Sequence, residues 1–198
     1  MRKAVVVLLV VVLGLMWAQA VLADEISETI ERAMELYLEG KHSGASSELQ
    51  WAVNLIQNLQ AEQLKELMPD PLPEWTAEEA TASVGVMGLF GGGMSVSRTY
   101  RKEDTRESIE IQILTESPLV QSMMMFLINP GPDTKPVRIK DEKALEKFSA
   151  QRKNGELSVV LEGKTLITVK GQRITDKEIL HKYMEMVDFE AVKKALAG

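Results

Sequence analysis

The chain has 198 residues, and its 23 basic and 29 acidic side chains give a net charge of −6 at pH 7. Because nucleic-acid binding and attachment to anionic lipid both depend on a surplus of Lys and Arg, the acidic balance argues against either class of protein. The chain contains no cysteine, which excludes disulfides, thiolate metal sites and cysteine nucleophiles. A hydrophobic content of 45% predicts a folded chain with one main domain.

The N-terminal 23 residues have the three parts of a cleavable export signal. A positively charged start precedes an uncharged apolar run over residues 4–17, and small residues then allow cleavage after Ala20 or, as we prefer, after Ala23. The competing interpretation is an uncleaved anchor, since residues 4–23 could just span a bilayer. The acidic residues that follow Ala23 favour cleavage. We therefore expect a periplasmic or secreted protein without a stable membrane anchor.

Residues 24–68 are predicted to form an antiparallel helical hairpin. Apolar side chains recur three and four residues apart over Ile26–Leu38 and again over residues 45–68, which is the spacing of one helix face. The segment Gly40–Gly44 separates the two helices. Three prolines then end the second helix, and residues 69–77 form a proline-rich junction to the rest of the chain.

The hairpin resembles a single tetratricopeptide-type repeat. The resemblance covers residues 33–52 and is carried by Ala33, Leu36, Gly40, Ala45, Leu49 and Ala52, with His42 where an aromatic residue usually lies. A working array of such repeats needs about three or more of them to build a core and a groove. The sequence holds no second copy, so we expect the hairpin to pack on its own domain.

Residues 78–198 change to short alternating segments that predict an antiparallel sheet. Tight turns at Asn154-Gly155 and Gly163-Lys164 make residues 143–170 a three-stranded meander, because the connections are too short for a crossover. The expected strands are Glu79–Val86, Met94–Arg101, Ser108–Leu114, Val137–Ile139, Lys143–Phe148, Leu157–Leu161 and Thr165–Lys170.

Three helices are expected to complete this domain. Pro118–Ile128 begins with a proline that suits a first helical turn. Residues 175–178 (TDKE) are a capping box for a helix through about Met186, and Phe189–Leu196 forms a last helix. A sheet with helices packed on one face is an α+β domain, and its layout is similar by analogy to the PsbP-like fold.

From Pro69 onward, the order of motifs resembles an uncharacterised exported bacterial protein family of unknown function. The motifs are Pro71–Trp75, a glycine loop before Met94–Tyr100, Ser117–Leu119 leading into Met123–Met125, and Val187–Phe189. This resemblance implies an exported location and the fold just described. It implies no activity.

Two motifs that could bind a cofactor are better explained by structure. The glycine-rich residues 85–93 are followed by a strand and by no Gly-Lys-Ser/Thr, so they do not form a phosphate loop, although Leu89 and Phe90 at this tip could contact a partner. Methionines 123–125 occupy successive helix positions and cannot converge on one copper ion. We expect helix 118–128 to be covered on two sides, the alternative being an exposed docking patch. No cofactor and no metal site are expected.

The remaining candidate residues are explained without catalysis. Both histidines, His181 included, lack metal-ligand spacing and are expected at the surface. Arg98 and Glu110 lie on neighbouring strands and are expected to form a cross-strand ion pair. Trp51 and Trp75 are expected in the core or at the junction, where Trp75 would fix the junction to the sheet domain.

The sequence favours binding over turnover. We hypothesise an exported, non-catalytic binding or adaptor protein whose partner is another envelope protein or a small ligand, bound on the sheet face or between hairpin and sheet. One alternative is a small hydrolase or transferase that uses His181 and carboxylates. Another is an envelope structural protein that oligomerises through its methionine-rich helix. Weak candidates for ligand or partner contact are Trp75, Leu89, Phe90, Arg98 and Glu110.

Export with cleavage predicts the first residue of the exported protein. When the whole chain is expressed in a bacterium, N-terminal sequencing and intact mass of the exported form should give Asp24 as the first residue. Recovery of a chain that still begins at Met1 in the membrane fraction would contradict cleavage and favour the anchor.

Overall fold

The computed structural model describes residues 25–84 and 93–197. The predicted export signal and the loop that carries Leu89 and Phe90 lie outside the described residues. The described part belongs to two compact units, one ending at Ile56 and the other starting at Gln57. Among the described residues, no helix combines the length and apolar character needed to cross a membrane.

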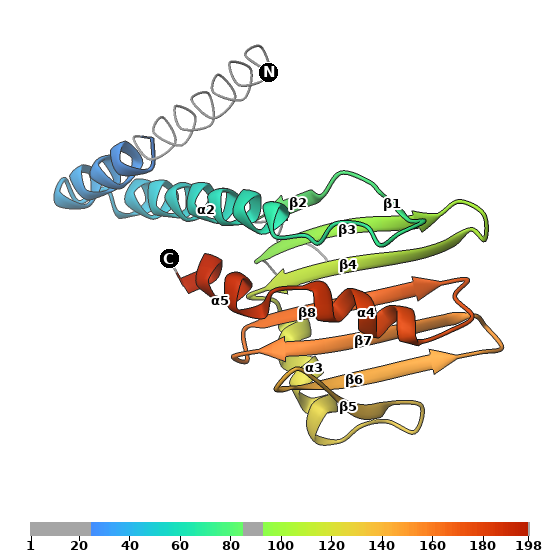
Figure 1. Cartoon of the computed structure of the whole chain (residues 1–198). Helices are drawn as coiled ribbons and strands as arrows, with labels where there is room; N and C mark the ends of the chain where they lie inside the picture. Colours follow the sequence, from blue (N-terminus) through green and yellow to red (C-terminus); the bar gives the residue numbers. More distant parts are fainter. Residues whose placement is uncertain (1–24, 85–92, 198) are drawn as a thin grey trace, which may run out of the picture. The chain divides into compact units, whose positions relative to one another are not determined.

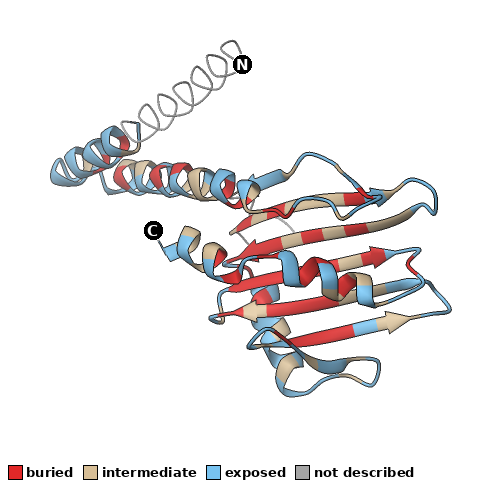
Figure 2. Cartoon of the chain, viewed as in Figure 1, coloured by how far each residue is buried: buried red, intermediate tan, exposed pale blue. Residues whose placement is uncertain are grey.

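The first unit contains helix α1 and the part of α2 that precedes Gln57. Helix α1 covers residues 25–38, Gly40 turns the chain at a φ of +78°, and α2 (His42–Glu66) begins two residues later. Buried and exposed positions alternate along both helices (Figure 2). Ala33, Ala52 and Leu55 are buried, whereas several large apolar side chains, such as Tyr37 and Leu38, are exposed. Trp51 is 53% exposed, so its predicted place in the core or at the junction is wrong. It precedes the buried Ala52 and therefore lies on a different side of the helix.

The second unit contains an eight-stranded sheet in which all neighbouring strands are antiparallel. The order is β1-β3-β4-β8-β7-β6-β5, with β2 also paired to β3. The predicted α+β class and the three-stranded meander are confirmed. The strands are β1 (Thr76–Ala77), β2 (Thr81–Val84), β3 (Met94–Lys102), β4 (Glu107–Thr115), β5 (Lys135–Ile139), β6 (Glu142–Ser149), β7 (Asn154–Leu161) and β8 (Thr165–Gln172).

Helices lie on both faces of this sheet, so the prediction that they pack on one face is wrong. Helices α4 (Glu178–Met186) and α5 (Phe189–Ala197) lie in front of the sheet in Figure 1, and α3 (Pro118–Ile128) lies behind it. Residues such as Ile111 and Ile167 face α4 and form the main core with Tyr183. Because side chains alternate along a strand, their neighbours in sequence face the α3 side.

Helix α3 is covered on one side only. Its buried residue is Val120, which packs with Leu114 and Leu166 in a small second cluster. Met125 and Ile128 are 65% and 71% exposed. The predicted bounds of this helix are confirmed, whereas the expectation that protein covers two of its sides is wrong.

The Asn154-Gly155 pair does not form the predicted turn. Both residues begin β7, and the chain turns over residues 150–153 instead. Gly155 lies opposite Gly171 of β8, and Leu180 of α4 packs over the pair. A Cβ on Gly155 would lie 2.7 Å from Leu180 Cδ1, and one on Gly171 would lie 3.0 Å from Leu180 Cδ2. Glycine is therefore required here for close packing rather than for a turn.

The outer strand β5 carries features that oppose pairing with a further strand. Pro136 has no N–H to donate, and the neighbouring Lys135 and Arg138 are exposed and charged. Proline and positive charge are the usual protection of an open sheet edge.

Replacing Gly171 should weaken the docking of α4. A Cβ at this position would lie 2.5 Å from Ile174 Cδ1, so Gly171→Val should lower the free energy of unfolding by about 1–3 kcal/mol. Denaturant titration measures the loss. The control is Gly131→Ala, because a Cβ there meets only Thr134 Oγ1 at 3.9 Å. A Gly171→Val protein as stable as the parent would contradict this packing.

Candidate functional site

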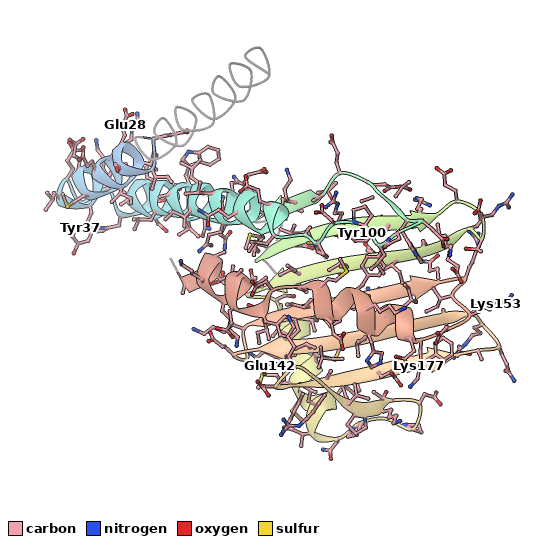
Figure 3. The ribbon with its side chains drawn as sticks, in the orientation of Figure 1. Glu28, Tyr37, Tyr100, Glu142, Lys153 and Lys177 are labelled. Carbon is pink, nitrogen blue, oxygen red and sulfur yellow. The ribbon has the colours of Figure 1, made fainter. Side chains whose placement is uncertain are left out.

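A carboxylate is buried on the core side of the sheet. Strand β6 directs Glu146 toward α4, and only 4% of this residue is exposed. Lys177 Nζ donates to Glu146 Oε1 at 2.8 Å, and His181 Nε2 lies 2.6 Å from Glu146 Oε2. Lys177 stands at the start of α4, over the sheet (Figure 3). These three residues attach the helix to β6.

Glu146, Lys177 and His181, here called the trio, form a buried carboxylate with two hydrogen-bond donors, and this arrangement sets the pKa of Glu146. Burial raises the pKa of Glu146, but the hydrogen bonds from Lys177 and His181 together outweigh burial and hold that pKa below its usual value. The same hydrogen bond raises the pKa of Lys177. The predicted surface role of His181 is wrong, because its ring is bound to a carboxylate that sequence reasoning missed.

Lys177 also changes how α4 begins. It occupies the N-cap position and cannot cap the helix, because an ammonium group has no acceptor for a backbone N–H; it binds Glu146 instead. Asp176 Oδ1 accepts the Glu178 N–H at 3.0 Å in its place. The predicted capping box started by Thr175 is therefore replaced by an aspartate cap one residue later.

Two neighbouring clefts lie beside strands β6 and β7, and the first is on the face of the sheet opposite α4. The first has a volume of about 200 Å³ and is bounded by Met123 and Phe126 of α3 and by Leu145 and Ser158 of the sheet. The second has a volume of about 630 Å³ and is bounded by charged side chains of β6–β8 and their loops. Both clefts are lined by Pro132, Asp133, Thr134, Lys147 and Glu156, so we treat them as one feature, the sheet groove.

Strand register arranges polar side chains in rows across this face. One row carries hydroxyl and amide groups, and the next carries charges of alternating sign. Ser158 Oγ lies 3.4 Å from Thr168 Oγ1 and 3.3 Å from Glu156 Oε1, so its hydroxyl is held at the floor of the first cleft. The two rows are Ser97, Gln112, Thr168 and Ser158, then Glu110, Lys170, Glu156 and Lys147.

The buried trio of Glu146, Lys177 and His181 is separate from the sheet groove. Glu146, Lys177 and His181 line neither cleft. Within residues 25–84 and 93–197, no group of three His, Cys, Asp or Glu side chains is placed to hold a metal ion. The sheet groove can donate and accept hydrogen bonds and offers charge of both signs.

The predicted ion pair between Arg98 and Glu110 is wrong. Arg98 lies opposite Ile111, and Glu110 lies opposite Thr99, so the two side chains point to different faces. The Arg98 guanidinium instead donates to three backbone carbonyls of the chain before β2, with distances of 3.0 Å to Glu78 O, 3.1 Å to Pro69 O and 3.4 Å to Met68 O.

Aromatic residues fix the junction, as predicted for Trp75. Its ring meets the Tyr183 ring edge-on with centroids 5.6 Å apart, and it is buried. Tyr100 Oη donates to Pro69 O at 2.7 Å, and Tyr183 Oη accepts the Leu72 N–H at 3.5 Å. Burial raises the pKa of Tyr183 to about 12 and that of Tyr100 further. These aromatic residues therefore hold the junction against the sheet domain.

Sequence reasoning missed the residues that line the sheet groove. Lys147 and Ser158 lie on the face opposite α4 in strands that were predicted, so alternation alone places them on one face, where Ser158 is 2% exposed. No sequence signal shows that α3 and residues 129–134 form a wall beside them. Of the predicted contact residues that the structure describes, Glu110 is on this face, and it lines neither cleft.

The trio predicts a pH-dependent contribution to stability. A depressed carboxyl pKa stabilises the fold above the ordinary value of 4.5, and the contribution is lost as pH falls through the folded-state pKa. Glu146→Gln should therefore lower the free energy of unfolding by about 1–3 kcal/mol at neutral pH. The deficit should shrink as pH falls below about 4.

Denaturant titrations across this pH range measure the effect. Glu185→Gln is the matched control, because Glu185 is exposed on the same helix and makes no hydrogen bond or ion pair with the described residues. A deficit for Glu146→Gln that stays constant over the whole range would contradict the stabilising role of the ionised carboxylate.

The chain was compared with known proteins at three levels. Neither the known protein families, nor the curated proteins, nor the solved structures include a match to it.

Proposed function

We propose that this chain is an exported protein that binds a ligand in the sheet groove without transforming it. The observation that carries the proposal is the pair of neighbouring clefts with shared walls, the first of which lies on the face of the sheet opposite α4. Concave sites with apolar walls and a few polar groups are where proteins bind small molecules. The exported location rests on the leader sequence alone.

The wall of the first cleft supports binding of an apolar group. Met123, Phe126 and Leu145 bring apolar side chains from two different elements to one cleft, with Ser158 as a polar floor. Methionine and phenylalanine adapt to irregular apolar surfaces. A ligand could therefore bury apolar surface here and keep a hydrogen bond at the floor.

The hydrolase alternative has one supporting observation, the short contact between His181 and Glu146. A carboxylate that holds an imidazole is one part of many acid–base sites. However, neither residue lines the sheet groove, and the same contact is sufficient as an attachment of α4. We therefore favour binding. If His181→Ala keeps the fold but loses a measured turnover, hydrolysis would be favoured over binding.

The methionine-rich helix could also mediate self-association. Its exposed apolar residues, such as Phe126 at 53% and Met125 at 65%, favour contact with some apolar surface. Sedimentation separates this alternative from ligand binding, because a monomer at high concentration contradicts self-association.

Nuclear magnetic resonance tests the proposed site. Amide signals of the purified chain should shift on addition of a mixture of small amphipathic and polar fragments, and the largest shifts should fall on the groove residues Thr134, Lys147, Glu156 and Ser158. Ser158→Leu should abolish the shifts, because the larger side chain occupies the first cleft. Ser97→Leu, on the same face but outside both clefts, is the control.

Shifts that cluster around His181 instead, or no shifts with any fragment, would contradict binding in the sheet groove.

A further inference from the structure

The ligand class can be inferred from the way the sheet groove changes along its length. Leu114, Leu166 and Val160 lie side by side on three strands and pack with α3. The next two rows outward are the hydroxyl and amide row and the charged row. The face therefore passes from apolar to polar to charged over consecutive side-chain positions.

Helix α3 packs on the apolar row, and the first cleft opens beside the neighbouring row, where Leu145 lies opposite Ser158. The first cleft lies between Met123, Phe126 and Leu145, and Phe126 keeps 53% of its surface exposed. Removing apolar surface from water favours binding. An apolar chain that covered these side chains would therefore be stabilised at this end.

The charged end has a surplus of positive charge. Four cations line the second cleft against two carboxylates, in a chain whose net charge is −6. None of these four cations makes an ion pair with any described residue. The cations are Lys135, Lys147, Arg152 and Lys170, and the carboxylates are Asp133 and Glu156.

The carboxylates that face these cations do not remove the surplus. Glu156 lies between Lys147 and Lys170 in the charged row, and Glu110 lies on the other side of Lys170. Arg152 Nε donates to Ser149 Oγ at 3.4 Å, a neutral acceptor. Lys147 lies opposite Glu156, and Lys135 lies opposite Glu146, which already binds Lys177 and His181. The carboxylates that line the cleft are therefore two against four cations.

We propose that the sheet groove binds an amphipathic anion, with its apolar chain in the first cleft and its anionic head among the cations of the second. This inference rests on the proposed function. The head is a carboxylate or a phosphate, since both accept hydrogen bonds from Lys and Arg. Ser158 lies at the floor of the first cleft, and Lys147 lines both clefts.

Isothermal titration of the whole purified chain with dispersed probes tests the ligand class. Decanoate and decyl phosphate should bind in the micromolar range, and decanol should bind at least about tenfold more weakly because it lacks the charge. Acetate and inorganic phosphate should not bind measurably, because they lack the chain. Added salt should weaken binding of the two charged probes. A comparison of decanoate with decyl phosphate identifies the preferred head.

Matched variants locate the binding. Lys147→Glu should weaken decanoate binding by about tenfold or more, and Ser158→Leu should abolish it. Lys182→Glu makes the same charge change on the exposed side of α4, over the other face of the sheet, and should leave the affinity unchanged. Retained folding is checked by circular dichroism for each variant.

Four results would overturn the proposal. They are equal binding of decanol and decanoate, binding of inorganic phosphate as tight as that of decyl phosphate, an equal effect of Lys182→Glu and Lys147→Glu, and retention on anionic vesicles without binding of dispersed decanoate. If the probes fail while the fragment mixture still shifts groove amides, this ligand class is wrong and binding in the groove stands. If both fail, the proposed function is wrong as well.

Discussion

The packing of Leu180 against the glycine pair of β7 and β8 determines the arrangement on which the rest of the second unit depends. Because Gly155 and Gly171 carry no Cβ, α4 approaches the sheet at this point more closely than any other residue would allow. The adjacent His181 is thereby brought to Glu146. Because α4 and α5 cover one face with apolar side chains, the polar side chains of the central strands lie on the opposite face.

The buried carboxylate makes the docking of α4 specific as well as stable. Removing a carboxylate from water is costly unless donors replace the lost hydration, and Lys177 and His181 are both donors of the same helical segment. A shift of α4 along the sheet would separate Glu146 from both. The charge therefore penalises alternative positions of the helix more strongly than an apolar contact of similar size.

Features with a local cause could be predicted from the sequence. Helix 118–128 and the alternation of Ser108–Leu114 depend on neighbouring residues in the chain, and the structure agrees with both. Gly155 was misjudged because Leu180, far along the chain, determines its role. Glu146 was missed because nothing near it shows that two donors lie above it. The clefts likewise depend on which strands become neighbours, which short-range pattern cannot supply.

The composition of the edge strand β5 affects whether molecules associate through their sheets at high concentration. Added strands extend a sheet by taking up free backbone donors and acceptors along its border, which is how fibres begin. Pro136 and the charges beside it interrupt that border, so a second molecule gains little by aligning there. The protein can therefore reach high local concentration without stacking edge to edge at β5, and recognition is left to side chains on the open face.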